Sequence, residues 1–313
     1  MRRCAGCTDV SAVLPSQRAL SGAAFATLLL IALMMGANHV AARIAFNNGA
    51  DVATAVVFRS TVTALVIVAI LASQRVRITF TARHKRFLPA IGLLIGVQSL
   101  CLYSAVARLP VALALLAFNT YPIWTAIWSA LVYRQKPEKA MLVAMPVILV
   151  GLALALDVFG AASGLGAAGQ WSRIGAGVAF ALAAAATFGL ALVLTQHEAG
   201  DVDGRVRTAT TMSMAAVVAL ITVSLQGGFH LPTAPAGWGG LAALTCLYGT
   251  AFTIMFTVLP RLGVVGNSAI MNVEPVFALV LGWLLLGQSI AAIQVAGALV
   301  VVGAVMALGM RKR

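Results

Sequence analysis

The feature that most constrains this chain is a series of ten apolar segments, each close to twenty residues long and separated by short polar connections. About 20 consecutive apolar residues are what an α-helix needs to cross the hydrocarbon core of a bilayer. Short connections favour antiparallel hairpins between successive helices. The sequence therefore predicts an all-α membrane protein with ten transmembrane helices, over residues 23–46, 52–72, 87–107, 110–132, 139–157, 173–195, 208–225, 238–259, 264–286 and 290–310.

The composition excludes a soluble globular protein. Only 9% of the 313 residues are charged and 61% are hydrophobic, whereas about 25% of the residues in a soluble domain are charged. A net charge of +13 would suggest nucleic-acid binding in a soluble protein. Here most basic residues occupy the short connections between apolar segments, so we expect no nucleic-acid partner.

The distribution of Lys and Arg predicts the orientation. If both termini face the cytoplasm, most of the 21 basic residues fall on that side. Only Arg108 and Arg173 then fall outside, while Arg43 and Arg59 lie within apolar segments. We therefore expect an N-in, C-in protein of the bacterial inner membrane, surrounded by membrane lipids.

The second half of the chain repeats the first at an offset of 153 residues. Each half contains five predicted helices, and an odd number forces the second copy to enter the membrane upside down. Inverted repeats of this kind are typical of secondary transporters, which bind substrate near the midplane between the halves. The predicted organisation is a cytoplasmic tail 1–22, a first repeat 23–157, a periplasmic linker 158–172, a second repeat 173–310 and a cytoplasmic C-terminus 311–313. The coincident pairs include Gly36/Gly189, Ser60/Ser213, Gly96/Gly249, Asn119/Asn272, Pro122/Pro275 and Gln135/Gln288.

Several short motifs occur in a fixed order along residues 25–310. They are Gly36-Ala-Asn38-His39 followed by Arg43, then Phe58-Arg59, Pro122, Asn272-Val-Glu274-Pro275 and Leu286-Gly287. In this order they resemble the EamA-like family of the drug/metabolite transporter superfamily. Three positions depart from the family pattern, namely Met35 for Trp, Arg43 for Lys and Gln288 for Glu. The resemblance implies export or import of small metabolites, often amino acids and related compounds, without ATP.

Polar residues that break the repeat are the best candidates for a substrate site, because residues present in both halves can be explained by shared architecture. An intramembrane charge costs at least ~2.5–3.5 kcal/mol, so an unmatched one needs a reason of its own. The unmatched pairs are Arg43/Gln196, Arg59/Met212, His39/Leu192 and Glu274/Tyr121. The candidate substrate-binding set is Asn38, His39, Arg43, Arg59, Tyr103, Tyr121, Trp124, Tyr248, Asn267 and Glu274, with Pro122 and Pro275 as hinges.

Each candidate also has a structural explanation that the sequence leaves open. Arg43 is close enough to a helix end for its guanidinium to reach the interface, and Arg59 can bond backbone carbonyls. Glu274 can form a static ion pair with either arginine. His39 can be a packing residue as well as a proton carrier, and the two prolines can be passive kinks.

No enzyme motif and no metal-ligand spacing is present, and Cys4 and Cys7 form a lone C-x-x-C. We therefore expect no enzymatic activity, no cofactor and no metal. The sequence favours a secondary-active exporter of a small polar metabolite, with proton coupling possible through Glu274. In that hypothesis an arginine binds a substrate carboxylate and Glu274 binds its ammonium group at a central cavity. The alternative is a lipid-linked carrier or flippase subunit on the same scaffold.

Overall fold

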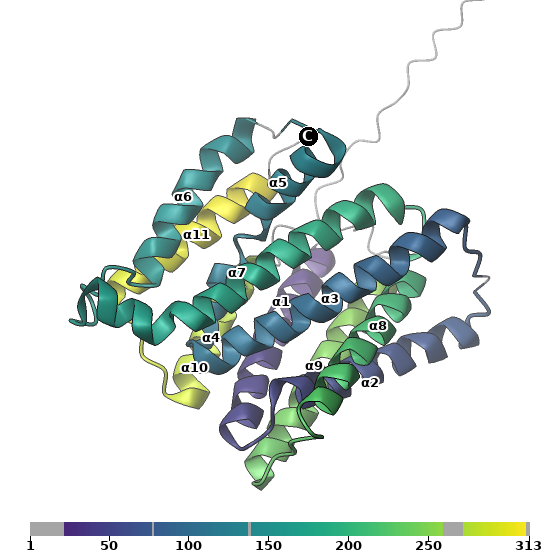
Figure 1. The fold of residues 1–313 in the computed structure, drawn as a ribbon, viewed down its shortest axis with the longest axis horizontal. Helices are drawn as coiled ribbons and strands as arrows, with labels where there is room; N and C mark the ends of the chain where they lie inside the picture. Colours follow the sequence, from purple (N-terminus) through teal and green to yellow (C-terminus); the bar gives the residue numbers. More distant parts are fainter. Residues whose placement is uncertain (1–21, 77, 137–138, 259–271, 311–313) are drawn as a thin grey trace, which may run out of the picture.

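The computed structural model describes residues 22–76, 78–136, 139–258 and 272–310. This part of the chain is helical and contains no β-strand. Figure 1 shows α6 beside α11 at one edge of the bundle, with α2, α8 and α9 grouped at the other. The helices are α1 (Gly22–Asn47), α2 (Val52–Ser73), α3 (Ala82–Arg108), α4 (Val111–Phe118), α5 (Tyr121–Tyr133), α6 (Lys139–Ala155), α7 (Gly166–Glu198), α8 (Gly204–Leu225), α9 (Pro235–Thr257), α10 (Glu274–Leu286) and α11 (Ala292–Met310).

Every predicted apolar segment contains a helix, but the fourth segment contains two. It breaks after Phe118, and α5 starts at Tyr121 with Pro122 in its first turn. Counting α4 and α5 as one span, seven helical stretches in the described residues are long and apolar enough to cross a membrane. Three further apolar helices are shorter, at Met141–Ala155, Glu274–Leu286 and Ala292–Ala307. The predicted start of the ninth segment, residues 264–271, lies outside the described residues.

The repeat predicted from the sequence is visible in the helix boundaries. Helix α5 spans Tyr121–Tyr133 and α10 spans Glu274–Leu286, so the two coincide at the same offset of 153 residues. Both end in a left-handed residue, Arg134 with φ 55° and Gly287 with φ 62°. The next residue is a glutamine in each repeat, Gln135 and Gln288. Its backbone N–H donates to a carbonyl of the last helical turns, that of Ser129 in α5 and that of Gly282 in α10.

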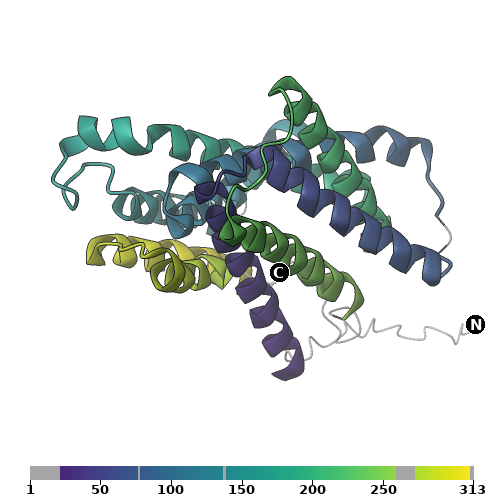
Figure 2. The same cartoon turned by 90° about the horizontal axis from the view of Figure 1, so that it is seen from below.

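The two repeats run in opposite directions. The end of α1 meets the α8–α9 connection, where the Thr233 N–H donates to the Asn48 carbonyl over 2.9 Å. The end of α7 instead lies at the opposite end of the bundle, beside the start of α3 and the end of α2. There Arg83 and the Gln74 side chain contact Asp201 and Arg205 of the α7–α8 connection. Because α2 leads from the first end to the second, α1 and α7 run toward opposite ends of the bundle. Figure 2 shows α1, in dark purple, running steeply across the view rather than alongside the teal helices.

Small residues allow the repeats to pack closely, and they do so at equivalent positions. Helix α1 packs on α9 and α10, while its counterpart α7 packs on α3 and α5. A Cβ at Gly36 would lie 3.1 Å from the Glu274 carbonyl oxygen, and one at Gly189 would lie 2.9 Å from the Thr125 backbone nitrogen. The G-x-x-x-G pair Gly92/Gly96 of α3 gives the same close approach to α8. These contacts bring α1, α2, α3 and α9 together around the centre of the bundle.

Candidate functional site

Arg59 of α2 is buried at the centre of the bundle, with 3% of the residue exposed. Its Nη2 donates to the Ser99 hydroxyl over 2.6 Å, and its Nη1 donates to the Tyr103 hydroxyl over 3.3 Å. Its Nε has no hydrogen-bond partner. None of the ion pairs among the described residues involves Arg59. A buried guanidinium without an acid is costly, so this position has unmet capacity to bind an anion.

Two tyrosine rings flank the Arg59 guanidinium. Its central carbon lies 4.5 Å from the ring centroid of Tyr103 and 4.1 Å from that of Tyr248. Cation–π contacts at a desolvated site contribute about 2 kcal/mol each. They compensate in part for the missing carboxylate and hold the charged plane in a fixed orientation. The guanidinium is therefore positioned before any ligand binds.

A second polar pair lies next to this cluster. The Tyr103 hydroxyl donates to the Asn38 side-chain oxygen over 2.8 Å, and the His39 ring lies 5.3 Å from the Tyr103 ring between centroids. His39 Nε2 is 3.2 Å from a Glu274 carboxylate oxygen. The His39 side chain is 3% exposed and the Glu274 side chain 22%. Glu274 is thus the more accessible member of the pair.

Glu274 is the first residue of α10, and Pro275 follows it in the first turn. A helix N-terminus carries partial positive charge, which stabilises a carboxylate at this position. The Glu274 carbonyl is where α10 touches Gly36 of α1. The proline after it provides a helical backbone angle without needing a hydrogen-bond acceptor for its nitrogen. Glu274 is therefore held at the first residue of α10, where α10 packs against α1, the helix that contains His39.

The structure gives Arg43 a different partner from the two that the sequence left open. Its Nη1 donates to the Val106 carbonyl over 2.6 Å and to the Leu109 carbonyl over 3.3 Å. These carbonyls lie at the end of α3, where intrahelical donors run out. None of the ion pairs among the described residues joins Arg43 to Glu274, and the Arg43 hydrogen bonds connect α1 to the end of α3.

The remaining candidates lie at the starts of α5 and α10 or next to them. The Tyr121 hydroxyl donates to the Asn272 side-chain oxygen over 3.2 Å, which joins the equivalent starts of α5 and α10. Trp124 packs against Gly189 of α7. Pro122 and Pro275 occupy the first turns of α5 and α10, where helices begin and no kink within a helix is needed. Asn267 lies outside the described residues.

Ser99 is a site residue that our sequence reasoning missed. It is 1% exposed and gives Arg59 its shortest hydrogen bond. The signal was present, because the repeat places Phe252 opposite Ser99 and so makes it another unmatched polar residue. Ser60 and Thr63 of α2 are also buried, and each has a hydroxyl without a partner.

The arrangement provides a fixed cation, an adjacent carboxylate–imidazole pair and aromatic walls within apolar helices. A carboxylate can bind the Arg59 guanidinium, and a cationic group can compete with His39 for Glu274. No group of three or more His, Cys, Asp or Glu side chains is placed to hold a metal in the ranges that the structure describes.

Comparison with known proteins identifies a family and solved structures of similar fold. The sequence model of the EamA-like transporter family matches residues 21–156 and matches again over 175–310. A solved structure titled "Crystal structure of protein" aligns with a TM-score of 0.57 at 19% identity, over 90% of this chain and 96% of its own. That identity supports a shared fold alone. No curated protein matches the chain.

Proposed function

Because this chain belongs to the EamA-like transporter family, and is therefore a multi-pass membrane transporter, we propose that it is a secondary-active exporter of small metabolites bearing a carboxylate, amino acids among them. The observation that carries this proposal is the buried Arg59, which pairs with no acidic side chain in the part of the chain that the structure describes. Its charge remains available to a substrate anion in a medium where such pairing is strong. No nucleotide enters the mechanism.

In the proposed cycle the substrate carboxylate binds Arg59 and the substrate ammonium group approaches Glu274. Glu274 must then leave His39, to which it is paired at 3.2 Å. The exchange supports a link between substrate binding and the contacts of α10 with α1. Such a link is what alternating access requires, because a ligand shifts a conformational equilibrium only by its differential affinity for the two states.

Proton coupling extends the same proposal. When the substrate leaves, Glu274 either returns to its contact with His39 or takes up a proton, and the proton neutralises its charge. Its partial exposure of 22% supports exchange of protons with water. The proposed setting is the bacterial inner membrane with both termini cytoplasmic. A reporter fused after Arg313 tests this, since alkaline phosphatase activity there would contradict the orientation.

One observation supports the lipid-linked alternative. A small apolar pocket of about 30 Å³ lies between α4, α10 and α11 and is lined by Pro275, Leu279 and Val295 among other side chains. Its apolar lining is compatible with contact to an acyl or polyprenyl chain, although its volume is far below that of such a chain. The buried Arg59 cluster and Glu274, however, favour a polar cavity over purely aliphatic walls.

Counterflow in proteoliposomes tests the proposal. Vesicles loaded with unlabelled amino acids should take up the labelled compound without nucleotide, and Arg59→Gln should lower that uptake on the order of a hundredfold. The same vesicles carry a fluorescent phospholipid whose flipping is measured in parallel. Lipid flipping without counterflow of any carboxylate would reject the carrier in favour of the alternative.

A further inference from the structure

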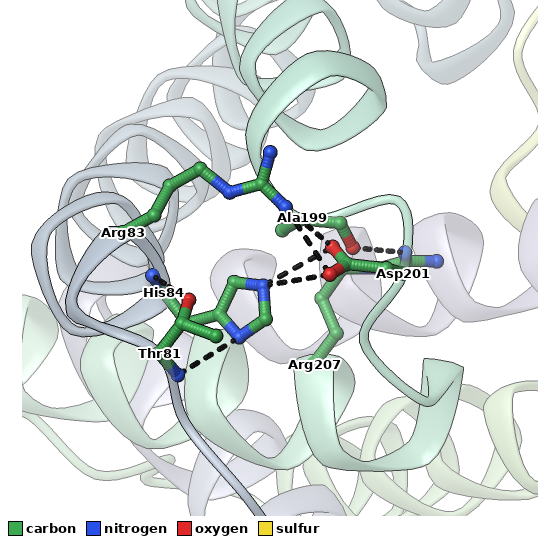
Figure 3. Close-up of polar contacts among 6 residues, drawn as sticks. All are labelled: Thr81, Arg83, His84, Ala199, Asp201 and Arg207. Carbon is green, nitrogen blue, oxygen red and sulfur yellow. Dashed lines mark hydrogen bonds and ion pairs between the residues drawn. The ribbon is translucent and has the colours of Figure 1, made fainter.

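The start of α3 is joined to the α7–α8 connection by a cluster of charged groups. We call this contact, between residues 81–84 and 199–207, the α3–α7 junction. One Arg83 nitrogen donates to both carboxylate oxygens of Asp201, over 3.0 and 3.1 Å. His84 Nε2 lies 3.1 and 3.2 Å from the same two oxygens. Figure 3 shows both side chains meeting the carboxylate from the same helix.

His84 is held in one tautomer by its own helix. The Thr81 backbone N–H donates to His84 Nδ1, while the Thr81 hydroxyl accepts from the His84 N–H, which together form a capping box. Because Nδ1 accepts, Nε2 carries the proton and donates it to Asp201. His84 is buried, with 4% exposed, so the helix cap aims a fixed donor at the other repeat.

The groups around Asp201 make the junction electrostatic on several sides. Arg207 of α8 donates to the Ala199 carbonyl over 3.2 Å, beside the Asp201 segment (Figure 3). Arg205 pairs with Asp203 and also bonds the Gln74 side chain at the end of α2. Hydrogen bonds, from its own backbone N–H first and from His84 next, hold the pKa of the Asp201 carboxyl below its ordinary range. Asp201 is therefore charged at neutral pH.

The repeat supplies a natural comparison at the opposite end of the bundle. There α1 and α9, the counterparts of α7 and α3, meet. Asn48 and Gly237 occupy the positions equivalent to Asp201 and His84. We call this contact, between residues 46–54 and 230–237, the α1–α9 junction. A Cβ at Gly237 would lie 2.6 Å from the Asn48 Cβ, so backbone and small side chains fill the contact.

Neutral hydrogen bonds complete the α1–α9 junction. Thr233 donates to the Asn48 carbonyl from its N–H over 2.9 Å and from its hydroxyl over 3.2 Å. The ionic contact there is His230 with Asp51, which is long at 3.9 Å and includes a histidine side chain that is 59% exposed. The two junctions are thus equivalent in position but different in chemistry.

We propose that the α3–α7 junction is an electrostatic latch that holds one end of the carrier closed, while the equivalent α1–α9 junction closes the other end by packing. The latch unites two helices of opposite repeats, and repeats that rock against each other must separate there. Asp201 is the shared acceptor of both α3 donors, so its charge determines how strongly that end closes. This inference rests on the proposed alternating access.

Distances between spin labels test the latch without any substrate. In a background with the four cysteines replaced, one label pair sits at the exposed Arg86 and Gln196 and the other at the exposed Asn47 and Gly239. Asp201→Asn should raise the population of the long distance at the first pair about tenfold, an effect of about 1.4 kcal/mol, and leave the second pair unchanged. Asp201→Glu should restore the short distance.

Salt provides a second measurement on the unmodified latch. Raising ionic strength should lengthen the first distance and leave the second, because screening weakens exposed ion pairs and spares packing. If Asp201→Asn does not fold, Arg83→Gln at its exposed position replaces it with the same expectation. The latch is overturned if the distance between the labels at Arg86 and Gln196 stays the same after charge removal and at high salt. It is also overturned if the distances of both label pairs increase equally. Since no substrate is present, an error in the proposed substrate class leaves these outcomes unaffected.

Discussion

The two repeats share their helix plan but differ in chemistry at the centre. Gly36 and Gly189 make equivalent close contacts with α10 and α5. The first repeat places Asn38, Arg59 and Tyr103 in one hydrogen-bonded cluster. The equivalent residues of the second repeat are Ala191, Met212 and Phe256. Packing thus follows the repeat, while the Asn38–Tyr103–Arg59 hydrogen-bonded cluster has no polar equivalent at the same positions of the second copy.

The difference is sharpest around Tyr248. The Arg59 guanidinium lies 4.1 Å above its ring, and its hydroxyl lies 3.7 Å from the Met212 sulfur. Positions 59 and 212 are equivalent, so a charged residue and an apolar one meet at the same aromatic ring. The two repeats therefore place different side chains at equivalent positions around Tyr248, the cationic Arg59 on one side and the apolar Met212 on the other. A substrate bound here would meet a cationic side and an apolar side.

The largest expected effect comes from Glu274→Gln, which should abolish transport while folded protein remains in the membrane. The amide keeps the volume of the side chain but removes its charge and its proton site. Counterflow measured beside membrane abundance checks this. Glu198→Gln at the end of α7 makes the same exchange at a carboxylate outside the candidate site, where it accepts from the Tyr133 hydroxyl, and as the control we expect it to retain transport. Transport by Glu274→Gln at the wild-type rate would remove Glu274 from the mechanism.

Arg59→Gln should lower transport on the order of a hundredfold, because losing one partner of a buried charged contact costs about 2–5 kcal/mol. The matched variant is Met212→Leu, which should change the rate less than about tenfold, since volume-conserving apolar exchanges cost under about 1.5 kcal/mol. Initial counterflow rates for the two variants measure the asymmetry directly. Equal losses would mean that both positions serve packing, and the comparison between repeats would fail.

Gly189→Ala tests the shared half of the comparison, the packing. Its Cβ would lie 2.9 Å from both the Thr125 nitrogen and the Trp124 Cβ, and α5 must shift to admit it. We expect a loss of about 1–3 kcal/mol in stability, visible as a lower thermal unfolding midpoint in detergent. Gly303→Ala on α11 meets nothing within 4 Å and should raise the midpoint. Similar behaviour of the two variants would contradict tight packing at Gly189.

The helices could be predicted because a bilayer sets their length and the sequence shows it directly. The break in the fourth segment could not. Residues 111–133 are apolar on both sides of the break, so hydropathy continues through it, and Pro122 indicated a bend only. The N–H of Asn119 still bonds the Leu115 and Leu116 carbonyls, so α4 ends there, and α5 begins at Tyr121 with Pro122, which has no N–H to continue the helical hydrogen bonds.

The site was predicted in part, through comparison of the repeats. That comparison selected Arg59, His39 and Glu274, which the structure brings near one another, although their roles remain predictions. It also selected Arg43, whose carbonyl partners at Val106 and Leu109 belong to another helix. Sequence spacing contains no information about which helix end an arginine meets. The His39–Glu274 pair was missed for the same reason, since only the packing of α1 on α10 brings them together.

The smallest expected effect separates the two tyrosines that flank Arg59. Tyr103→Phe and Tyr248→Phe both keep the ring, so both preserve the cation–π contact. The Tyr103 hydroxyl donates to Asn38 over 2.8 Å and accepts from Arg59, whereas the Tyr248 hydroxyl reaches a methionine sulfur at 3.7 Å, a weak acceptor. A hydrogen bond of this kind contributes about 0.5–1.5 kcal/mol. Tyr103→Phe should therefore lower counterflow about three- to tenfold, and Tyr248→Phe less than twofold.

The measurement is the initial rate at limiting substrate, with Arg59→Gln added to each variant. If the hydroxyl acts by orienting Arg59, Tyr103→Phe has no further effect once Arg59 is gone. An undiminished effect in that double variant would show that Tyr103 acts on the substrate or on Asn38 without Arg59, and the two-walled site would need a different polar wall.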